Sequence, residues 1–213
     1  TQQPTLFPYT TLFRSVLATL ALPGAALAAC PTGLPPGVYC GSLDPAAAVA
    51  GAYKMDETHA AVLAKVSHIG YSKSVFRFDT AQATLVWDPA DLSKSSLKAT
   101  IDTASITSNV PGFAKEISGQ FLKADKFPKA SFVSTAFRRI DPTHGEIDGQ
   151  FTLAGVTKPL TLKIALVGAG KGFGHPRLGA EAVGVMDPQA YGLPSVFLDP
   201  IELVIDAEFE RQD

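Results

Sequence analysis

Regular alternation of apolar and polar side chains is the feature that most constrains how this chain can fold. In residues 201–210, apolar side chains occupy every second position from Ile201 to Phe209 and alternate with acidic ones, with Val204 the one exception. Because successive side chains of a β-strand point to opposite sides, the pattern predicts a strand with one buried and one solvated face. Comparable patterns predict about nine strands, at residues 61–67, 75–79, 84–88, 97–102, 130–137, 146–153, 160–166, 178–186 and 201–210.

Turn-forming residues separate several of these segments, including Asp88-Pro89 and Ala154-Gly155. Many short antiparallel strands with one apolar face are typical of a barrel or a sandwich. A closed barrel removes exposed strand edges entirely. We therefore expect an all-β fold, with a closed antiparallel barrel favoured over a sandwich.

One segment has helical spacing instead. Phe113, Ile117 and Phe121 are four residues apart, which places them on one face of a helix. The spacing predicts a short helix within residues 108–122, lying across one end of the barrel. Either Ser108 or Asn109 is expected to cap it, with Pro111 in the first turn.

Residues 1–28 have the order of features of a secretory signal. Arg14, the first cation of the chain, precedes the apolar residues 16–22, a helix-breaking Pro23-Gly24 and a run of small residues. The chain does not begin with Met, so we expect that this start is not the natural one. The sequence then divides into a Pro/Gly/Ala-rich linker at 29–51 and the barrel domain at 52–211, and the barrel is expected outside the cytoplasm.

The two cysteines allow two interpretations. Cys30 and Cys40 can form a disulfide, which an oxidising compartment favours. Alternatively, residues 27–30 fit a bacterial lipobox, in which Cys30 would be lipidated and would anchor the chain. Lipidation would leave Cys40 as an odd thiol, which favours the disulfide.

Composition and motifs exclude several functions. Eighteen Lys and Arg residues against twenty Asp and Glu give a net charge of −2, which offers no electrostatic footprint for nucleic acid. The nucleophile-elbow, zinc-protease and P-loop patterns are not matched. We therefore expect a binding protein with no cofactor and no metal, not an enzyme.

The apolar faces of the strands leave open whether the barrel is filled or hollow. An eight-stranded barrel has an interior that side chains can just fill, or that can hold one ligand. His68 shares parity with Val62, Ala64 and Val66 and should point inward. It fits a buried hydrogen-bonded histidine, a contact with the polar end of a ligand, or a metal ligand.

Motifs along the whole expected barrel resemble the YceI-like polyisoprenoid-binding family. Singly these motifs are weak, but they occur in order from Tyr53 to Phe209. They are the residues 53–59, Val62, Val66, His68, Gly70-Tyr71-Ser72, and the segments 101–107, 115–119, 126–135, 149–162 and 191–192.

The resemblance implies an extended, lipocalin-like antiparallel barrel with a short helix at one end, secreted to the bacterial periplasm. It also implies an isoprenoid chain, such as a polyprenyl or quinone tail, held along the barrel axis, with only transient membrane contact unless Cys30 is lipidated. The alternative is a non-catalytic structural barrel with a filled core. The sequence does not decide whether the protein is a monomer or a homodimer. Strand parity assigns the ligand contacts to Val62, Ala64, Val66, Phe76, Phe78, Leu97, Ile101, Phe132, Phe151, Leu153, Leu162 and Ile164, with His68 near a mouth.

Two positions depart from the family pattern. Ala64 stands where the family usually carries an aromatic residue, which could widen the channel. Val185-Met186-Asp187 replaces a segment that often contains an arginine. A diphosphate head group is therefore not expected here.

Overall fold

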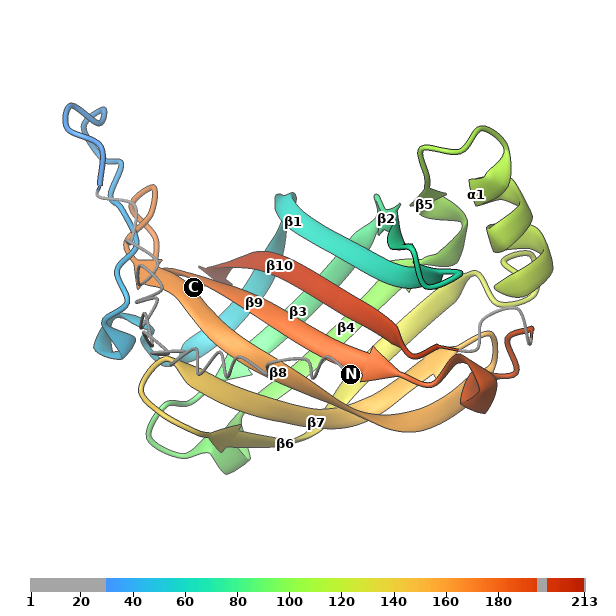
Figure 1. Ribbon diagram of the computed structural model, residues 1–213. Coiled ribbons are helices and arrows are strands. Elements are labelled where there is room, and N and C mark those ends of the chain that lie inside the picture. Colours follow the sequence, from blue (N-terminus) through green and yellow to red (C-terminus); the bar gives the residue numbers. More distant parts are fainter. Residues whose placement is uncertain (1–29, 195–198, 213) are drawn as a thin grey trace, which may run out of the picture. The chain divides into compact units, whose positions relative to one another are not determined.

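Ten antiparallel strands dominate the computed structural model, which describes residues 30–194 and 199–212 (Figure 1). Residues 33–213 belong to one unit. In chain order the strands are β1 (Gly51–His68), β2 (Ser72–Phe78), β3 (Ala81–Trp87), β4 (Ser96–Asp102), β5 (Ile106–Thr107), β6 (Lys129–Arg139), β7 (His144–Leu153), β8 (Val156–Gly170), β9 (Arg177–Met186) and β10 (Ile201–Gln212).

Eight of these strands close into a barrel. Their order is β10-β9-β8-β7-β6-β4-β3-β1, and a further pairing between β10 and β1 completes the ring. The ring leaves none of the eight strands at the edge of an open sheet, as expected from the cost of unpaired edges. The predicted all-β antiparallel barrel is confirmed.

Strand β1 serves two parts of the sheet. Its first residues, Gly51 to Lys54, pair with β3, whereas Val62 to His68 pair with β2. A register shift between Met55 and Ala60 separates the two parts on the β10 side. Strands β2 and β5 therefore extend the sheet outside the closed ring.

Each predicted segment lies on a strand, but the sequence pattern underestimated two strands and missed one. Strand β1 begins ten residues before the predicted start at Ala61, because the polar residues 56–59 interrupt the alternation at the bulge. Strand β8 continues to Gly170. The two-residue β5 is too short to show a period.

The predicted helix forms, but its beginning was predicted wrongly. Helix α1 (Phe113–Glu116) continues as a π-helical turn, η4 (Ile117–Phe121). Its N-cap is Gly112, at φ 78°, and no side chain caps the helix. The Ser108 hydroxyl instead accepts a hydrogen bond from the Val110 N–H at 3.2 Å, so it caps a turn before the helix. In Figure 1, α1 lies at one end of the barrel.

The segment before β1 packs onto the opposite end of the barrel from α1. Ser42 and Ala169 of β8 form a β-bridge, and Ala48 is buried just after the short helix η1 (Pro45–Ala47). The Trp87 indole N–H donates to the Ala48 carbonyl at 3.0 Å. This part of the predicted linker is therefore a folded plug.

Three short helical turns complete the described elements: η2 (Leu92–Lys94), η3 (Thr103–Ser105) and η5 (Pro188–Tyr191). Within residues 30–194 and 199–212, no helix has the length and apolar character needed to cross a membrane. Cys30 and Cys40 are both disulfide-bonded. The predicted signal segment 1–28 lies outside the described residues.

Candidate ligand cavity

The interior of the barrel is hollow between two packed clusters. One cluster, at the α1 end, includes Phe76, Ile117 and Phe151. The other, at the plugged end, includes Tyr53 and Phe209. A cavity of about 320 Å³ extends along the inner faces of the strands, within the size range of small-molecule sites.

The inward-facing side chains show why this interior is not solid. Ala64, Phe78, Leu97 and Ile164 line the cavity, yet they are only partly buried. Apolar side chains on the inner face of a filled barrel would be fully enclosed by their neighbours. Here they keep accessible surface because they border an empty space. This finding decides between the filled and the hollow barrel in favour of the hollow one.

Most residues assigned from strand parity line the cavity. The structure places twelve of the thirteen there: Val62, Ala64, Val66, Phe76, Phe78, Leu97, Ile101, Phe132, Phe151, Leu153, Leu162 and Ile164.

The thirteenth assignment, His68, is wrong. His68 is exposed and does not line the cavity. It is the last residue of β1 and pairs with Ser72 at the end of the β1–β2 hairpin. Parity correctly places Val62, Ala64 and Val66 on the inner face. At His68 the hairpin already extends beyond the lumen, so the inner side of the strand is exposed there.

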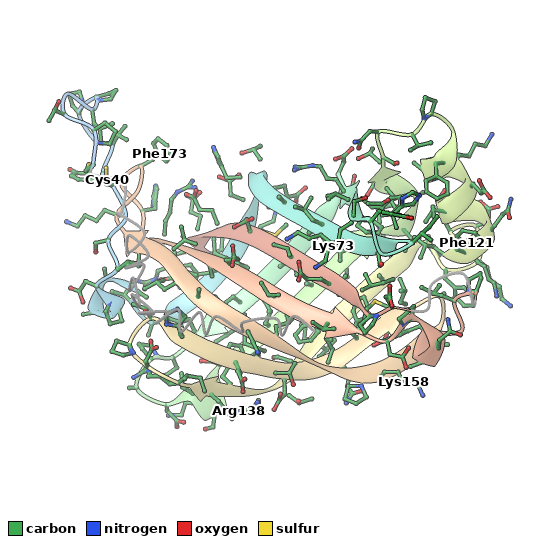
Figure 2. All side chains as sticks on the ribbon, viewed as in Figure 1. Cys40, Lys73, Phe121, Arg138, Lys158 and Phe173 are labelled. Atoms are coloured by element: carbon green, nitrogen blue, oxygen red, sulfur yellow. The ribbon has the colours of Figure 1, made fainter. Side chains whose placement is uncertain are left out.

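Apolar side chains line both ends of the lumen. At the α1 end, Ile117, Phe121 and Leu122 line the cavity, and the Phe113 ring packs against Phe76 at 5.7 Å between centroids. Figure 2 shows Phe121 at this end and Phe173 of the β8–β9 connection at the other. At that other end, Ala48 and Trp87 border the cavity.

Two connections form a polar rim to the cavity. Pro89 and Leu92, between β3 and β4, border it together with residues at and beside the β6–β7 turn: Arg138, Arg139 and residues 141–146. The Arg139 guanidinium donates to the Pro89 carbonyl at 3.1 Å and so spans the two connections. Ala90, Asp141 and Pro142 of these connections are exposed, whereas Ile117 and Leu122, which line the cavity at the α1 end, are buried. We therefore take this rim as the mouth.

Charges at the mouth are mostly paired. The Asp141 carboxylate lies 2.9 Å from His144 Nδ1. Backbone N–H donation from Thr143, followed by the contact with His144, lowers the pKa of Asp141 to about 2. Arg138, which borders the cavity with Glu146, forms ion pairs with Glu146 and Asp148.

Arg139 differs from these residues. It has no carboxylate partner in the part of the chain that the structure describes. The mouth could not be predicted from the sequence, because no local pattern indicates which two turns meet across a barrel.

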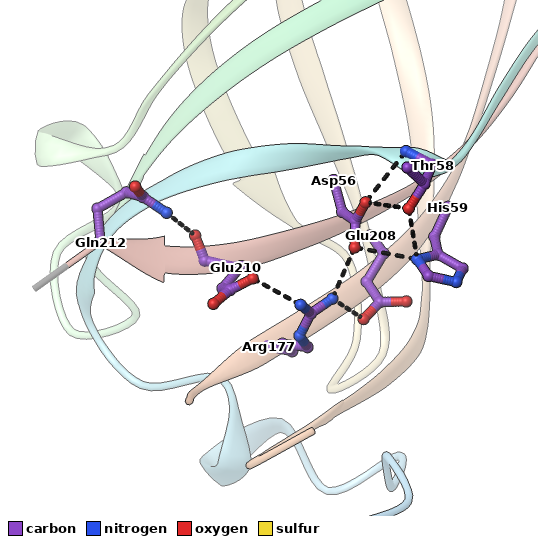
Figure 3. Close-up of polar contacts among 7 residues, drawn as sticks. All are labelled: Asp56, Thr58, His59, Arg177, Glu208, Glu210 and Gln212. Atoms are coloured by element: carbon purple, nitrogen blue, oxygen red, sulfur yellow. Dashed lines mark hydrogen bonds and ion pairs between the residues drawn. The ribbon is translucent and has the colours of Figure 1, made fainter. Parts of the chain in front are cut away.

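A second polar cluster lies outside the cavity, where the barrel closes (Figure 3). Arg177, at the start of β9, forms ion pairs with Asp56 of β1 at 3.0 Å and with Glu208 of β10 at 2.6 Å. It also pairs with Glu210 at 2.5 Å. The Arg177 side chain is only 13% exposed, so one guanidinium joins three strands at the β1–β10 seam. Among the described residues, no group of His, Cys, Asp and Glu is arranged to hold a metal ion.

The fold and the cavity define a closed antiparallel β-barrel that encloses an apolar lumen. A model of the YceI-like domain matches residues 53–209, and the chain belongs to this family. It is 35% identical to a UPF0312 protein of Pseudomonas putida over 171 residues, covering 78% of this chain and 89% of the relative. It is also 35% identical to protein YceI of Salmonella arizonae over 173 residues, covering 78% and 90%.

Solved structures support the fold. BcnA of Burkholderia cenocepacia matches with a TM-score of 0.65 at 20% identity, covering 72% of this chain and 98% of that one. A YceI protein of Campylobacter jejuni matches with a TM-score of 0.62 at 26% identity, covering 70% and 91%. A polyisoprenoid-binding domain from Saccharophagus degradans matches with a TM-score of 0.58 at 11% identity, covering 76% and 99%.

Proposed function

We propose that this protein binds the chain of an isoprenoid lipid, such as a polyprenyl or a quinone tail, in its barrel cavity. The carrying observation is a cavity of about 320 Å³ to which every strand of the ring contributes apolar side chains. Removing each CH₂ group from water is worth about 0.8 kcal/mol, so the affinity of such a lumen grows with chain length. Binding by hydrophobic transfer needs no catalytic group, and we propose no reaction.

Family membership supports this ligand class. The Saccharophagus degradans neighbour is described as a polyisoprenoid-binding domain, and it has the same barrel fold. The family pattern often has an arginine in the segment that is Val185-Met186-Asp187 in this chain. Without that cation, this part of the lumen suits an uncharged ligand. Met186 stands in that segment, is only 3% exposed and lines the cavity. A diphosphate buried beside Met186 would lack a partner for its charge.

We also propose that the protein works outside the cytoplasm, in the periplasm. Two features support this location: the signal-like order of residues 1–28 and the disulfide-bonded state of Cys30 and Cys40. Disulfides persist in oxidising compartments and are rare in the cytosol.

Lipid extraction tests the proposed ligand directly. The purified protein would be extracted with organic solvent, and the extract analysed by mass spectrometry for isoprenoid series spaced by one C5 unit. Stripped protein would then be offered a polyprenol, ubiquinone and a saturated fatty acid of similar length, each delivered from cyclodextrin. We expect uptake of the two isoprenoids at a stoichiometry near one. Failure to retain either isoprenoid would contradict the proposal.

A further inference from the structure

The tip of the β1–β2 hairpin combines exposed apolar side chains with a strained backbone. Ile69 is 81% exposed and Tyr71 is 89% exposed. The Tyr71 N–H donates to the His68 carbonyl at 3.0 Å and closes a turn whose central residues, Ile69 and Gly70, have φ values of 53° and 75°. Positive φ is a genuine outlier for a β-branched residue, and turns of this kind favour Asn-Gly.

Among the described residues, burial of the Ile69 side chain does not compensate this strain. The Ile69 side chain is neither buried nor suited to its backbone conformation, so it does not stabilise the fold. Strained residues that persist at an exposed position point to a functional role. Two highly exposed apolar side chains, one on each side of Gly70, further indicate a contact with something outside the chain.

The hairpin arm connects this tip to the wall of the cavity. Pairing of β10 with β1 ends at Lys65, and pairing of β5 with β2 begins only at Arg77. Between these points the arm has no other strand beside it among the described residues. Val66 and Phe76, within the arm, line the cavity and belong to the cluster at the α1 end. The tip therefore projects from the α1 end of the barrel (Figure 1).

We propose that the tip formed by Ile69 and Tyr71 inserts into the surface of a lipid bilayer and seats the α1 end of the barrel on it. The inference rests on the proposed function, because isoprenoid lipids reside in membranes. The mouth lies at the opposite end of the barrel, so the tip holds the protein at the bilayer and is not itself the passage for the ligand. Tyrosine is enriched at membrane–water interfaces, where its ring and its hydroxyl each find a suitable environment. The branched Ile69 side chain gains by transfer into the acyl region.

Charges around the tip favour apolar insertion over attraction to anionic lipids. Lys73, two residues after Tyr71, and Lys65 both pair with Glu202, at 3.3 and 2.9 Å. The single carboxylate of Glu202 thus offsets one of these two positive charges, and only one net positive charge remains beside the tip. We therefore expect binding to neutral vesicles, with little dependence on salt.

Vesicle flotation tests the tip. The probe is a vesicle of pure phosphatidylcholine, with a second preparation that contains one quarter phosphatidylglycerol. Ile69→Asn suits the positive φ, so the variant should fold at least as stably as the wild type. Combined with Tyr71→Ser, it should lower the bound fraction about tenfold or more in both preparations.

Phe173→Ser is the matched control. Phe173 is an exposed aromatic residue, 59% accessible, in the β8–β9 connection at the opposite end of the barrel (Figure 2). This variant should float as the wild type does. Equal flotation of the wild type and the double variant, or no flotation of the wild type, would overturn the inference.

Two further measurements separate this inference from its alternatives. If the double variant changes only self-association, measured by sedimentation velocity, the tip is a contact between protein copies and the membrane proposal is wrong. Uptake of ubiquinone from cyclodextrin bypasses the membrane and should be the same in the double variant as in the wild type. Failure of flotation with normal uptake would overturn only the membrane contact, whereas failure of uptake would overturn the proposed function.

Discussion

The ring of Phe132 lies over Gly149, on the neighbouring strand β7, so closely that no side chain fits at the glycine. A Cβ atom added to Gly149 would lie 2.6 Å from Phe132 Cε2 and 2.7 Å from the Val133 carbonyl oxygen. The second of these neighbours is backbone and cannot rotate away. The glycine thus leaves room for the Phe132 ring, which lines the cavity.

This contact predicts a measurable cost for one methyl group. Gly149→Ala should destabilise the protein by about 2 kcal/mol through overpacking, and it should weaken ligand uptake because the Phe132 ring is displaced. Urea unfolding measures the first effect. Gly119→Ala is the control, because Gly119 has no atom within 4 Å of the added Cβ and has no positive φ. The control should be neutral or stabilising by about 0.5–1 kcal/mol.

Ala64 offers a direct test of the hollow lumen. It lines the cavity and is only partly buried, so Ala64→Trp has an empty space to enter. We expect the variant to fold, with a loss of less than about 1.5 kcal/mol, and to lose isoprenoid uptake because the indole occupies the channel. Thermal unfolding and the uptake assay check the two expectations.

Ala169 provides the matched comparison for Ala64. It is 2% exposed in the packed cluster at the plugged end and does not line the cavity. Ala169→Trp should therefore cost about 3 kcal/mol by overpacking. Equal destabilisation at the two positions would show that the space beside Ala64 is not available to a ligand.

The residues that face the lumen could be predicted well, because alternation along a single strand is enough to tell which of its side chains point inward. Alternation along β1, for example, correctly places Val62, Ala64 and Val66 on the inner face from neighbouring residues alone. Parity does not say where a strand leaves the barrel, and so His68 was assigned to a site that it does not reach. The family resemblance, confirmed over residues 53–209, supplied the helix-ended barrel class but not these details.

The mouth and the seam cluster could not be predicted in the same way. The contact from Arg139 to Pro89 joins residues fifty positions apart, and the one from Arg177 to Asp56 joins residues 121 positions apart. Both depend on the order in which strands close the ring. A period of two along a strand contains no information about that order.

The Arg177 cluster predicts a stability difference between two arginines. Arg177→Met should destabilise the protein by about 2 kcal/mol, because it leaves the carboxylates of Asp56, Glu208 and Glu210 close together without their shared cation. Arg138→Met is the control, since Arg138 also contacts two carboxylates but is 45% exposed. It should have a clearly smaller effect, because solvent screens exposed pairs.

A double-mutant cycle tests whether the Arg177 effect comes from the ion pairs. Glu208→Gln combined with Arg177→Met should destabilise by less than the sum of the two single variants, because each single change removes the same contact. Urea unfolding of the four proteins gives the coupling. Strict additivity would mean that Arg177 acts through packing of its stem and not through its charge.

Acid should weaken the same seam. The Thr58 hydroxyl, then His59 and Arg177, bond to the Asp56 carboxylate and hold its pKa well below the usual range. A carboxyl whose pKa is lower in the folded state than in the unfolded one stabilises the fold above its unfolded pKa, about 4. That contribution is lost as the pH falls through the folded value.

We therefore expect the free energy of unfolding to decrease as the pH drops below about 4, and to decrease less steeply in Asp56→Asn. His59 has the opposite sign. Its hydrogen bond to Asp56 raises its pKa, so its contribution is complete below an unfolded pKa of about 6.5 and is lost as the pH rises through the folded value. His59→Gln should therefore flatten the profile on the neutral side. It should also make the acid side less steep, because it removes one of the contacts that lower the pKa of Asp56. Urea unfolding between pH 2 and pH 8 measures both slopes, and identical acid slopes in the wild type and Asp56→Asn would contradict the role assigned to this carboxylate.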